Sequence, residues 1–226
     1  MNLQDKVALI TGSSKGIGRA TAIAFSRKGC RVVVTYASSE ADAEETLRLC
    51  QGEGHYATRL DLRNDANIRH VVEEAAERMG GIHVLVNNAG IIQRRSFLEQ
   101  SLEDIRRQIA VNLIGPIGMT QAALPYLMRQ VDALILNVAG VGSKKAFPGA
   151  PICIASKFGL RGFTQALALE LPPHVRTYCV NPGRTSTQMT GYTGASPDQV
   201  AEIIVRAAEE TLGKRSGDDV DVKEYL

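Results

Sequence analysis

Residues 7–18 read VALITGSSKGIG and join a short apolar run to a loop that holds three glycines. Gly12, Gly16 and Gly18 have the spacing G-x-x-x-G-x-G. Glycine lets a backbone turn sharply and approach a ligand closely, and a helix that starts in such a loop offers free N–H groups to a phosphate. The stretch therefore predicts a strand, a phosphate-binding turn and the start of a helix.

The loop by itself has two interpretations. Its spacing differs from the G-x-G-x-x-G fingerprint of dinucleotide-binding proteins. An ordinary tight turn explains the glycines equally well when the loop is taken alone. The position of the loop between the first apolar run and a helix favours phosphate binding.

Apolar runs alternate with helical patterns along the rest of the chain. The clearest helical pattern covers residues 65–79, where apolar side chains recur at helical spacing. The apolar runs lack polar alternation, which is typical of parallel strands buried on both faces. The predicted strands are Val7–Thr11, Arg31–Thr35, His55–Leu60, Val84–Val86, Leu134–Val138, Arg176–Val180 and Asp219–Val222.

Such strand–helix alternation predicts an α/β fold with a doubly wound sheet. No internal repeat and no stretch rich in Pro, Gly and Ser divides the chain, so residues 1–226 are expected to form a single domain. The chain is 44% hydrophobic and 22% charged, with a net charge of +2. That charge is spread along the sequence, which argues against a nucleic-acid partner.

Neither a membrane segment nor a metal site is expected. No apolar run approaches the roughly 18 residues of a membrane helix, and residues 1–6 show no secretory pattern. The cysteines at positions 30, 50, 153 and 179 have neither metal-ligand spacing nor the density of a disulfide framework. A cytoplasmic location is the natural expectation.

Several motifs together resemble the short-chain dehydrogenase/reductase family, and most closely its 3-oxoacyl-carrier-protein reductase branch. These motifs are the glycine loop, Asn87–Gly90, Asn112 and Asn181–Gly183, and they occur in the order found in that family. The resemblance covers nearly the whole chain. It implies a seven-stranded Rossmann sheet that is mostly parallel, helices on both faces, and a homodimer or homotetramer. It also implies hydride transfer between a nicotinamide cofactor and a small carbonyl or alcohol substrate.

The resemblance also implies which residues hold the cofactor. Asp61 resembles an aspartate that contacts adenine, although it could equally be a turn residue before a helix. Asn87 is expected to support the sheet, and Thr187 to lie on the nicotinamide side. The full expected set is Gly12, Ser14, Lys15, Gly16, Ile17, Gly18, Arg19, Ser38, Asp61, Leu62, Asn88, Ala89, Gly90, Lys157, Pro182, Gly183, Thr185 and Thr187.

The end of the second strand favours NADP(H) over NAD(H). An NAD site places an acidic residue there for the ribose 2′-hydroxyl, whereas residues 35–39 read TYASS. Lys15 and Arg19 are candidate partners for a 2′-phosphate. The alternative is that both are solvated surface charges.

Two of the four catalytic positions of the family are changed. Asn112 and Lys157 match its asparagine and lysine, but Cys153 stands where the tyrosine is expected and Gly140 where the serine is expected. A positioned general acid contributes about 10²–10⁴ in rate, and an oxyanion donor about 10²–10³. Ser143, Tyr178 and Tyr192 are possible substitutes, and the two tyrosines are expected to be structural or exposed.

Two functions remain open. The chain is an NADP(H)-dependent oxidoreductase with altered catalysis, or a catalytically silent NADP(H)-binding sensor, scaffold or partner subunit. In the family, helices corresponding to residues 101–128 and 152–171 form the contacts between subunits. The apolar residues Phe158, Phe163, Leu167 and Leu171 could serve either that contact or the core.

Cys153 has two interpretations of its own. It is expected near a helix N-terminus with Lys157 one turn further on, which would favour a reactive thiolate. The alternative is a small apolar residue that fills space.

Overall fold

All seven predicted strands are present, and they form one parallel sheet. The computed structural model describes residues 1–226. The strands run in the order β3-β2-β1-β4-β5-β6-β7, and every neighbouring pair is parallel. This confirms the doubly wound Rossmann sheet. The strands are β1 (Val7–Ile10), β2 (Arg31–Tyr36), β3 (Tyr56–Arg59), β4 (Val84–Asn87), β5 (Ala133–Val138), β6 (Val175–Asn181) and β7 (Asp219–Asp221).

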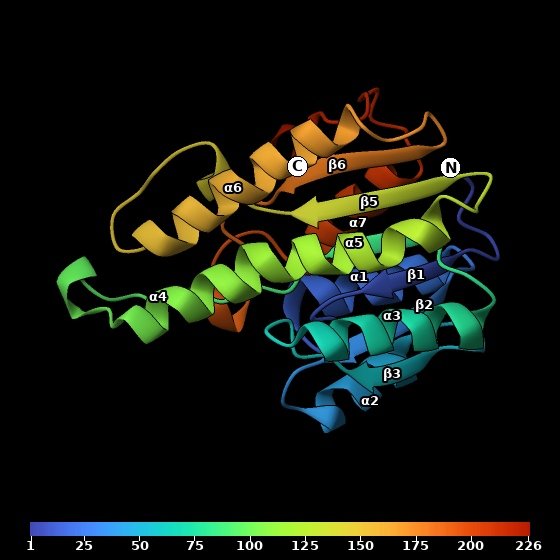
Figure 1. Ribbon diagram of the computed structural model, residues 1–226, viewed down its shortest axis with the longest axis horizontal. Helices are drawn as coiled ribbons and strands as arrows, with labels where there is room; N and C mark the ends of the chain where they lie inside the picture. Colours follow the sequence, from blue (N-terminus) through green and yellow to red (C-terminus); the bar gives the residue numbers. More distant parts are fainter.

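Helices cover both faces of the sheet. In Figure 1, α3, α5 and α6 lie in front of the strands, α1 and α7 lie behind them, and α4 projects beyond the sheet. The helices are α1 (Gly16–Arg27), α2 (Glu40–Leu49), α3 (Asp65–Met79), α4 (Leu102–Ile109), α5 (Gly115–Leu127), α6 (Pro151–Ala168) and α7 (Pro197–Ala208). None of them is both long and apolar enough to cross a membrane.

Alternate residues of each strand serve two separate cores. Ala8 and Ile10 belong to the core under α1 and α7, whereas Val7 and Leu9 belong to the core under α3 and α5. The period of two follows from the pleat of a strand. Both faces are therefore apolar, which explains why the strand sequences show no polar alternation.

The helix predicted at residues 65–79 is α3, with these same bounds. The Asn64 side chain accepts a hydrogen bond from the N–H of Asn67 at its start, and Gly80 ends it with a φ of 75°. Asparagine caps and left-handed glycine stops are common helix signals.

The helix expected at residues 101–128 is interrupted. It consists of α4, a π-helical turn at Ala110–Ile114, and α5. A single π turn inside a longer helix is uncommon and often lies at a functional site. Here it contains Asn112.

The order of the strands reverses between β1 and β4. The chain builds β2 and β3 on one side of β1, and then returns to place β4 on the other side. Loops at the carboxyl ends of β1 and β4 therefore lie side by side, which is where open α/β sheets bind ligands.

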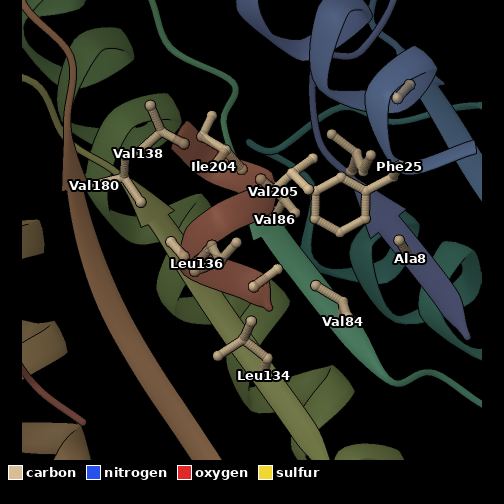
Figure 2. Packing of buried hydrophobic residues seen from close by; sticks show 14 of the residues in the cluster. Ala8, Phe25, Val84, Val86, Leu134, Leu136, Val138, Val180, Ile204 and Val205 are labelled. Carbon is tan, nitrogen blue, oxygen red and sulfur yellow. The ribbon is translucent and has the colours of Figure 1, made fainter. Parts of the chain in front are cut away.

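Phe25 is the largest fully buried side chain of the core under α1 and α7. Figure 2 shows its ring beside Val86 and Val205. We expect Phe25→Ala to lower the free energy of unfolding by about 3–5 kcal/mol, because it leaves a cavity in packed surroundings. Phe97→Ala is the matched control, since the Phe97 side chain is 60% exposed. Urea unfolding followed by circular dichroism measures both, and equal effects would contradict this description of the core.

Candidate functional site

Side-chain hydroxyls fasten the glycine loop to the two neighbouring strands. Thr11 Oγ1 accepts hydrogen bonds from the backbone N–H groups of Asn88 (2.9 Å) and Ala89 (3.0 Å). Thr35 Oγ1 accepts from the N–H of Gly12 (3.0 Å). The Asn88 side chain donates back to the carbonyl oxygens of Thr11 (2.9 Å) and Gly12 (3.2 Å). The loops after β1 and β4 are thus held as one unit.

The start of α1 leaves a row of backbone donors free. The N–H groups of residues 14–18 donate to no other atom of the protein. Lys15 is the N-cap of α1, and no side chain caps this end of the helix. Free N–H groups combined with the positive end of a helix dipole form a ready binding site for a phosphate.

The three glycines are required by close contacts. Gly12 has a φ of 63°, and a β-carbon there would lie 2.9 Å from Cα of Ala89. A β-carbon at Gly18 would overlap the carbonyl oxygen of Gly12 and the side chain of Asn88. Gly16 has a φ of 56°, and its missing β-carbon would face Thr187 at 3.1 Å. The structure therefore brings together Gly16 and Thr187, two of the residues expected to hold the cofactor.

A second cluster of predicted residues lies around Gly90. A β-carbon on Gly90 would be 3.4 Å from Oδ1 of Asn112 and 3.5 Å from Nζ of Lys157. Asn112 is fully buried, and its amide binds both the N–H (2.8 Å) and the carbonyl oxygen (2.9 Å) of Ile91. The π turn places Asn112 in position to hold this loop.

Lys157 points its amine to the carboxyl end of β5. Its Nζ donates to the carbonyl oxygen of Val138 at 2.9 Å. Burial lowers the pKa of this amine, because desolvation disfavours the charged form. The amine still has donors left for a ligand.

Gly140 and Cys153, which stand where the resemblance places a serine and a tyrosine, have distinct local geometries. Gly140 has a φ of 98°, a region that residues with a β-carbon rarely adopt. Cys153 is the third residue of α6 and is partly buried. Burial raises the pKa of its thiol, and this effect outweighs the nearby charges of Lys157 and Arg94. The expected helix-terminal position of Cys153 is confirmed, but its electrostatics favour the space-filling interpretation over a thiolate.

Two of the three possible substitute donors, Ser143 and Tyr178, have hydroxyls that are held within the protein. Ser143 is fully buried, and its hydroxyl donates to Oδ1 of Asn181 at 2.8 Å. The hydroxyl of Tyr178 donates to Glu210 at 2.9 Å, so Tyr178 is structural. Tyr192 is 72% exposed, so both predictions for the tyrosines are confirmed.

The segment after β6 folds back on itself. The N–H of Ser186 donates to the carbonyl oxygen of Ala195 (2.7 Å), and the N–H of Ala195 to that of Arg184 (2.9 Å). The hydroxyl of Thr190 bonds to the carbonyl oxygen of Thr185 inside this turn. Pro182 and Gly183 lead into the segment, and the carbonyl oxygen of Pro182 accepts from the N–H of Val141 at 3.0 Å.

Arg19 was predicted as a phosphate partner, but its guanidinium is already bound within the protein. Its guanidinium donates to the carbonyl oxygens of Ser14 (2.6 and 2.9 Å) and Asp42 (3.0 Å), and to Thr46 Oγ1 (3.1 Å). Arg19 therefore connects the glycine loop to α2. Lys15 is 56% exposed and pairs with the carboxylate of Asp42 at 2.8 Å.

The sequence shows no carboxylate at the end of β2, but the structure places the carboxylate of Asp42 beside Lys15. The residue is six positions beyond the end of β2, but α2 begins at Glu40 and turns its first residues back toward the loop. Ser38 is exposed, and its hydroxyl makes no hydrogen bond within the protein.

Asp61 is a turn residue before a helix, which is one of the two interpretations that the sequence allowed. Its carboxylate accepts two hydrogen bonds from the Arg63 side chain (2.9 and 2.7 Å) and one from the N–H of Arg63 (3.0 Å). The Arg63 guanidinium lowers the pKa of Asp61 to about 2. Leu62 is buried in the core under α3 and α5, so only its backbone is available to a ligand.

Sequence reasoning missed several residues that build this site. Thr11 and Thr35 look like ordinary strand residues, and Asp42 looks like a helix surface charge. Ser156 holds the Asn112 side chain at 3.2 Å. Asn87 binds Asn137 at 2.8 Å and Thr120 at 3.1 Å inside the sheet, which confirms the supporting role expected for it.

Comparisons with known proteins agree with this geometry. A family model described as short chain dehydrogenase matches residues 6–198. A 3-oxoacyl-[acyl-carrier-protein] reductase of Synechocystis is 35% identical over 198 residues, covering 86% of this chain and 80% of the relative. The FabG reductase of Aquifex aeolicus is 33% identical, covering 98% of this chain and 97% of the relative.

Solved structures resemble the chain over nearly its full length. A 3-ketoacyl-(acyl-carrier-protein) reductase of Brucella melitensis, complexed with NADH, has a TM-score of 0.90 at 28% identity and covers 97% of each chain. A short chain dehydrogenase of Burkholderia cenocepacia, in complex with NADP, has a TM-score of 0.88 at 28% identity and the same coverage. The chain belongs to the short-chain dehydrogenase/reductase family and resembles its 3-oxoacyl-carrier-protein reductase branch.

Proposed function

We propose that this oxidoreductase-family chain binds NADP(H) at the carboxyl edge of its sheet and reduces ordinary carbonyl substrates only very slowly. The observation that carries the proposal is the row of free N–H groups at residues 14–18, with Lys15 beside it. Such a row fits a pyrophosphate. The complexes of the Brucella protein with NADH and of the Burkholderia protein with NADP support dinucleotide binding, and the second of them supports NADP(H).

The residues around the free N–H groups suggest how the cofactor is held. Residues 14–18 would hold the pyrophosphate, and Lys15, Ser38 and Asp61 would bind the adenosine half. Gly90, Thr187 and Lys157 would bind the nicotinamide half. When bound, the cofactor supplies or accepts a hydride. Lys157, whose amine has donors left beyond the carbonyl oxygen of Val138, would donate a hydrogen bond to the ribose.

The proton donor is the part that the site lacks. A cysteine at position 153 is shorter than a tyrosine, and burial raises the pKa of its thiol. Gly140 has no side chain, and the hydroxyl of Ser143 is held by Asn181. Turnover of a substrate therefore requires a donor from outside these positions, such as water. The alternative role is a catalytically silent sensor, scaffold or partner subunit.

We expect the purified chain to bind NADPH several-fold more tightly than NADH, because Lys15 can reach a 2′-phosphate. Titration with nicotinamide fluorescence measures both affinities. Gly18→Ala should abolish binding, since its β-carbon would collide with Gly12 and Asn88. Gly162→Ala is the control, because no atom lies within 4 Å of the added carbon. Equal affinities for the two cofactors, or tighter binding of NADH, would refute the NADP(H) assignment.

We also expect the reduction of β-ketoacyl and diketone substrates to be near background. Cys153→Tyr should raise the rate by a factor that approaches the contribution of a general acid, which is about 10²–10⁴-fold. Gly140→Ser should add less, because a β-carbon is strained at a φ of 98°. Cys153→Phe is the control that fills the same space without a hydroxyl. The assay follows NADPH oxidation, and fast wild-type turnover that survives Cys153→Ala would show that the proton donor lies elsewhere.

A homo-oligomer completes the proposal, and the exposed apolar residues support it. On the two helical regions expected at the subunit contact, Phe163, Leu167 and Leu171 pack against the chain's own cores. Phe158 is exposed instead, and so are Leu102, Ile114, Met128 and Leu169.

Light scattering should give a dimer or tetramer mass at micromolar concentration. We expect Phe158→Glu combined with Ile114→Glu to produce monomers, because a buried unpaired charge is strongly unfavourable. Leu49→Glu is a matched control, because this exposed leucine lies on α2. A monomeric mass for the wild type would contradict the proposal.

A further inference from the structure

We propose that Asp42 is a specificity-determining residue that competes with the 2′-phosphate of NADP(H) for Lys15. This inference rests on the proposed function, because it concerns which of the two nicotinamide cofactors the site prefers. Asp42 is an acidic residue that opposes the preference for NADPH expected from Lys15. The carboxylate belongs to a helix and not to the end of a strand.

The position of Asp42 is fixed by the start of α2. Ser39 is the N-cap, and its hydroxyl accepts a hydrogen bond from the N–H of Asp42 at 3.3 Å. The Asp42 carbonyl oxygen accepts from Arg19 at 3.0 Å. Its carboxylate then lies 2.8 Å from Nζ of Lys15 and 3.6 Å from the Arg19 guanidinium. Lys15 and Ser39 keep the pKa of Asp42 below its usual range, so the carboxylate is charged at neutral pH.

Lys15 is the cation of the glycine loop that can move to a ligand. Arg19 is held by Ser14, Asp42 and Thr46, so its guanidinium is committed to the loop and to α2. Arg59, the other cation beside the end of β2, donates to the carbonyl oxygen of Ala37 at 3.4 Å. Lys15 makes one exposed ion pair, and exposed ion pairs of this kind are weak and easily exchanged.

The two cofactors meet Asp42 differently. A 2′-phosphate is doubly charged for most of the neutral range, so it must take Lys15 from Asp42 and then remain near a carboxylate of the same sign. The free 2′-hydroxyl of NADH needs no cation and leaves the ion pair intact. The carboxylate therefore weakens NADPH binding and leaves NADH binding unchanged. Removing the charge of Asp42 should therefore increase the preference for NADPH over NADH.

The test compares Asp42→Asn, Lys15→Gln and the double variant with the wild type, with NADPH and NADH as the titrated probes. Glu45→Gln is the control, because Glu45 is an acidic residue of the same helix that pairs with Arg48. Asp42→Asn should tighten NADPH by about 3- to 10-fold, the size of one like-charge interaction in water. In the Lys15→Gln background the gain should shrink, because the two residues compete directly. Glu45→Gln should change neither affinity.

The outcomes separate this inference from the proposed function. If the wild type binds both cofactors and Asp42→Asn leaves their ratio unchanged, the inference is wrong and the proposed function stands. If Asp42→Asn weakens NADH, Asp42 binds the ribose hydroxyl and the inference is overturned. If the wild type binds neither cofactor, the proposed function is wrong and the inference falls with it. Thermal melts of Asp42→Asn and Asp42→Ala check that α2 remains folded, and both variants should give the same direction of change.

Discussion

The site depends on the hydroxyl of Thr11, which joins the loops at the ends of β1 and β4. It accepts from the N–H groups of Asn88 and Ala89, while Thr35 holds Gly12 from the opposite side. Because these backbone groups have partners, the loop is rigid at its base. The N–H groups of residues 14–18 are left free at its tip. A rigid set of free donors pays little ordering entropy when a phosphate binds. The threonines therefore convert a glycine-rich turn into a preorganised site.

Much of the fold follows from the sequence because its signals are local. The seven apolar runs gave the seven strands with small differences at their ends, and the apolar spacing at residues 65–79 gave α3. The interruption at Ala110–Ile114 was not predicted, because a π turn has no periodic signature of its own. The sequence also left open which face Phe158 and Leu167 serve. Only the packing of α6 shows that Leu167 is partly buried against the core and that Phe158 is exposed.

The candidate site was less predictable, because its charges are paired across distant segments. Lys15 and Arg19 look equivalent in the sequence, yet Arg19 is bound to the carbonyl oxygen of Ser14, whereas Lys15 makes one exposed ion pair. Asp42 comes from a helix surface, and Ser143 looks available until Asn181 is seen to hold it. Such pairings depend on the tertiary structure. The residues at positions 140 and 153, in contrast, could be read directly from the sequence, and the φ of Gly140 shows that its backbone conformation favours glycine. The family fold is thus retained, and Cys153 stands at the position where the resemblance places a tyrosine.

The central claim is that the free N–H groups of residues 14–18 bind the pyrophosphate of a nicotinamide dinucleotide. Amide hydrogen exchange of this segment, measured with and without NADP, tests it most directly, since these groups donate to nothing in the protein itself. The account predicts fast exchange in the free protein and strong protection on addition of NADP. The amides inside β1, which already bond within the sheet, should change little. Unchanged exchange at residues 14–18 under saturating NADP would contradict the account.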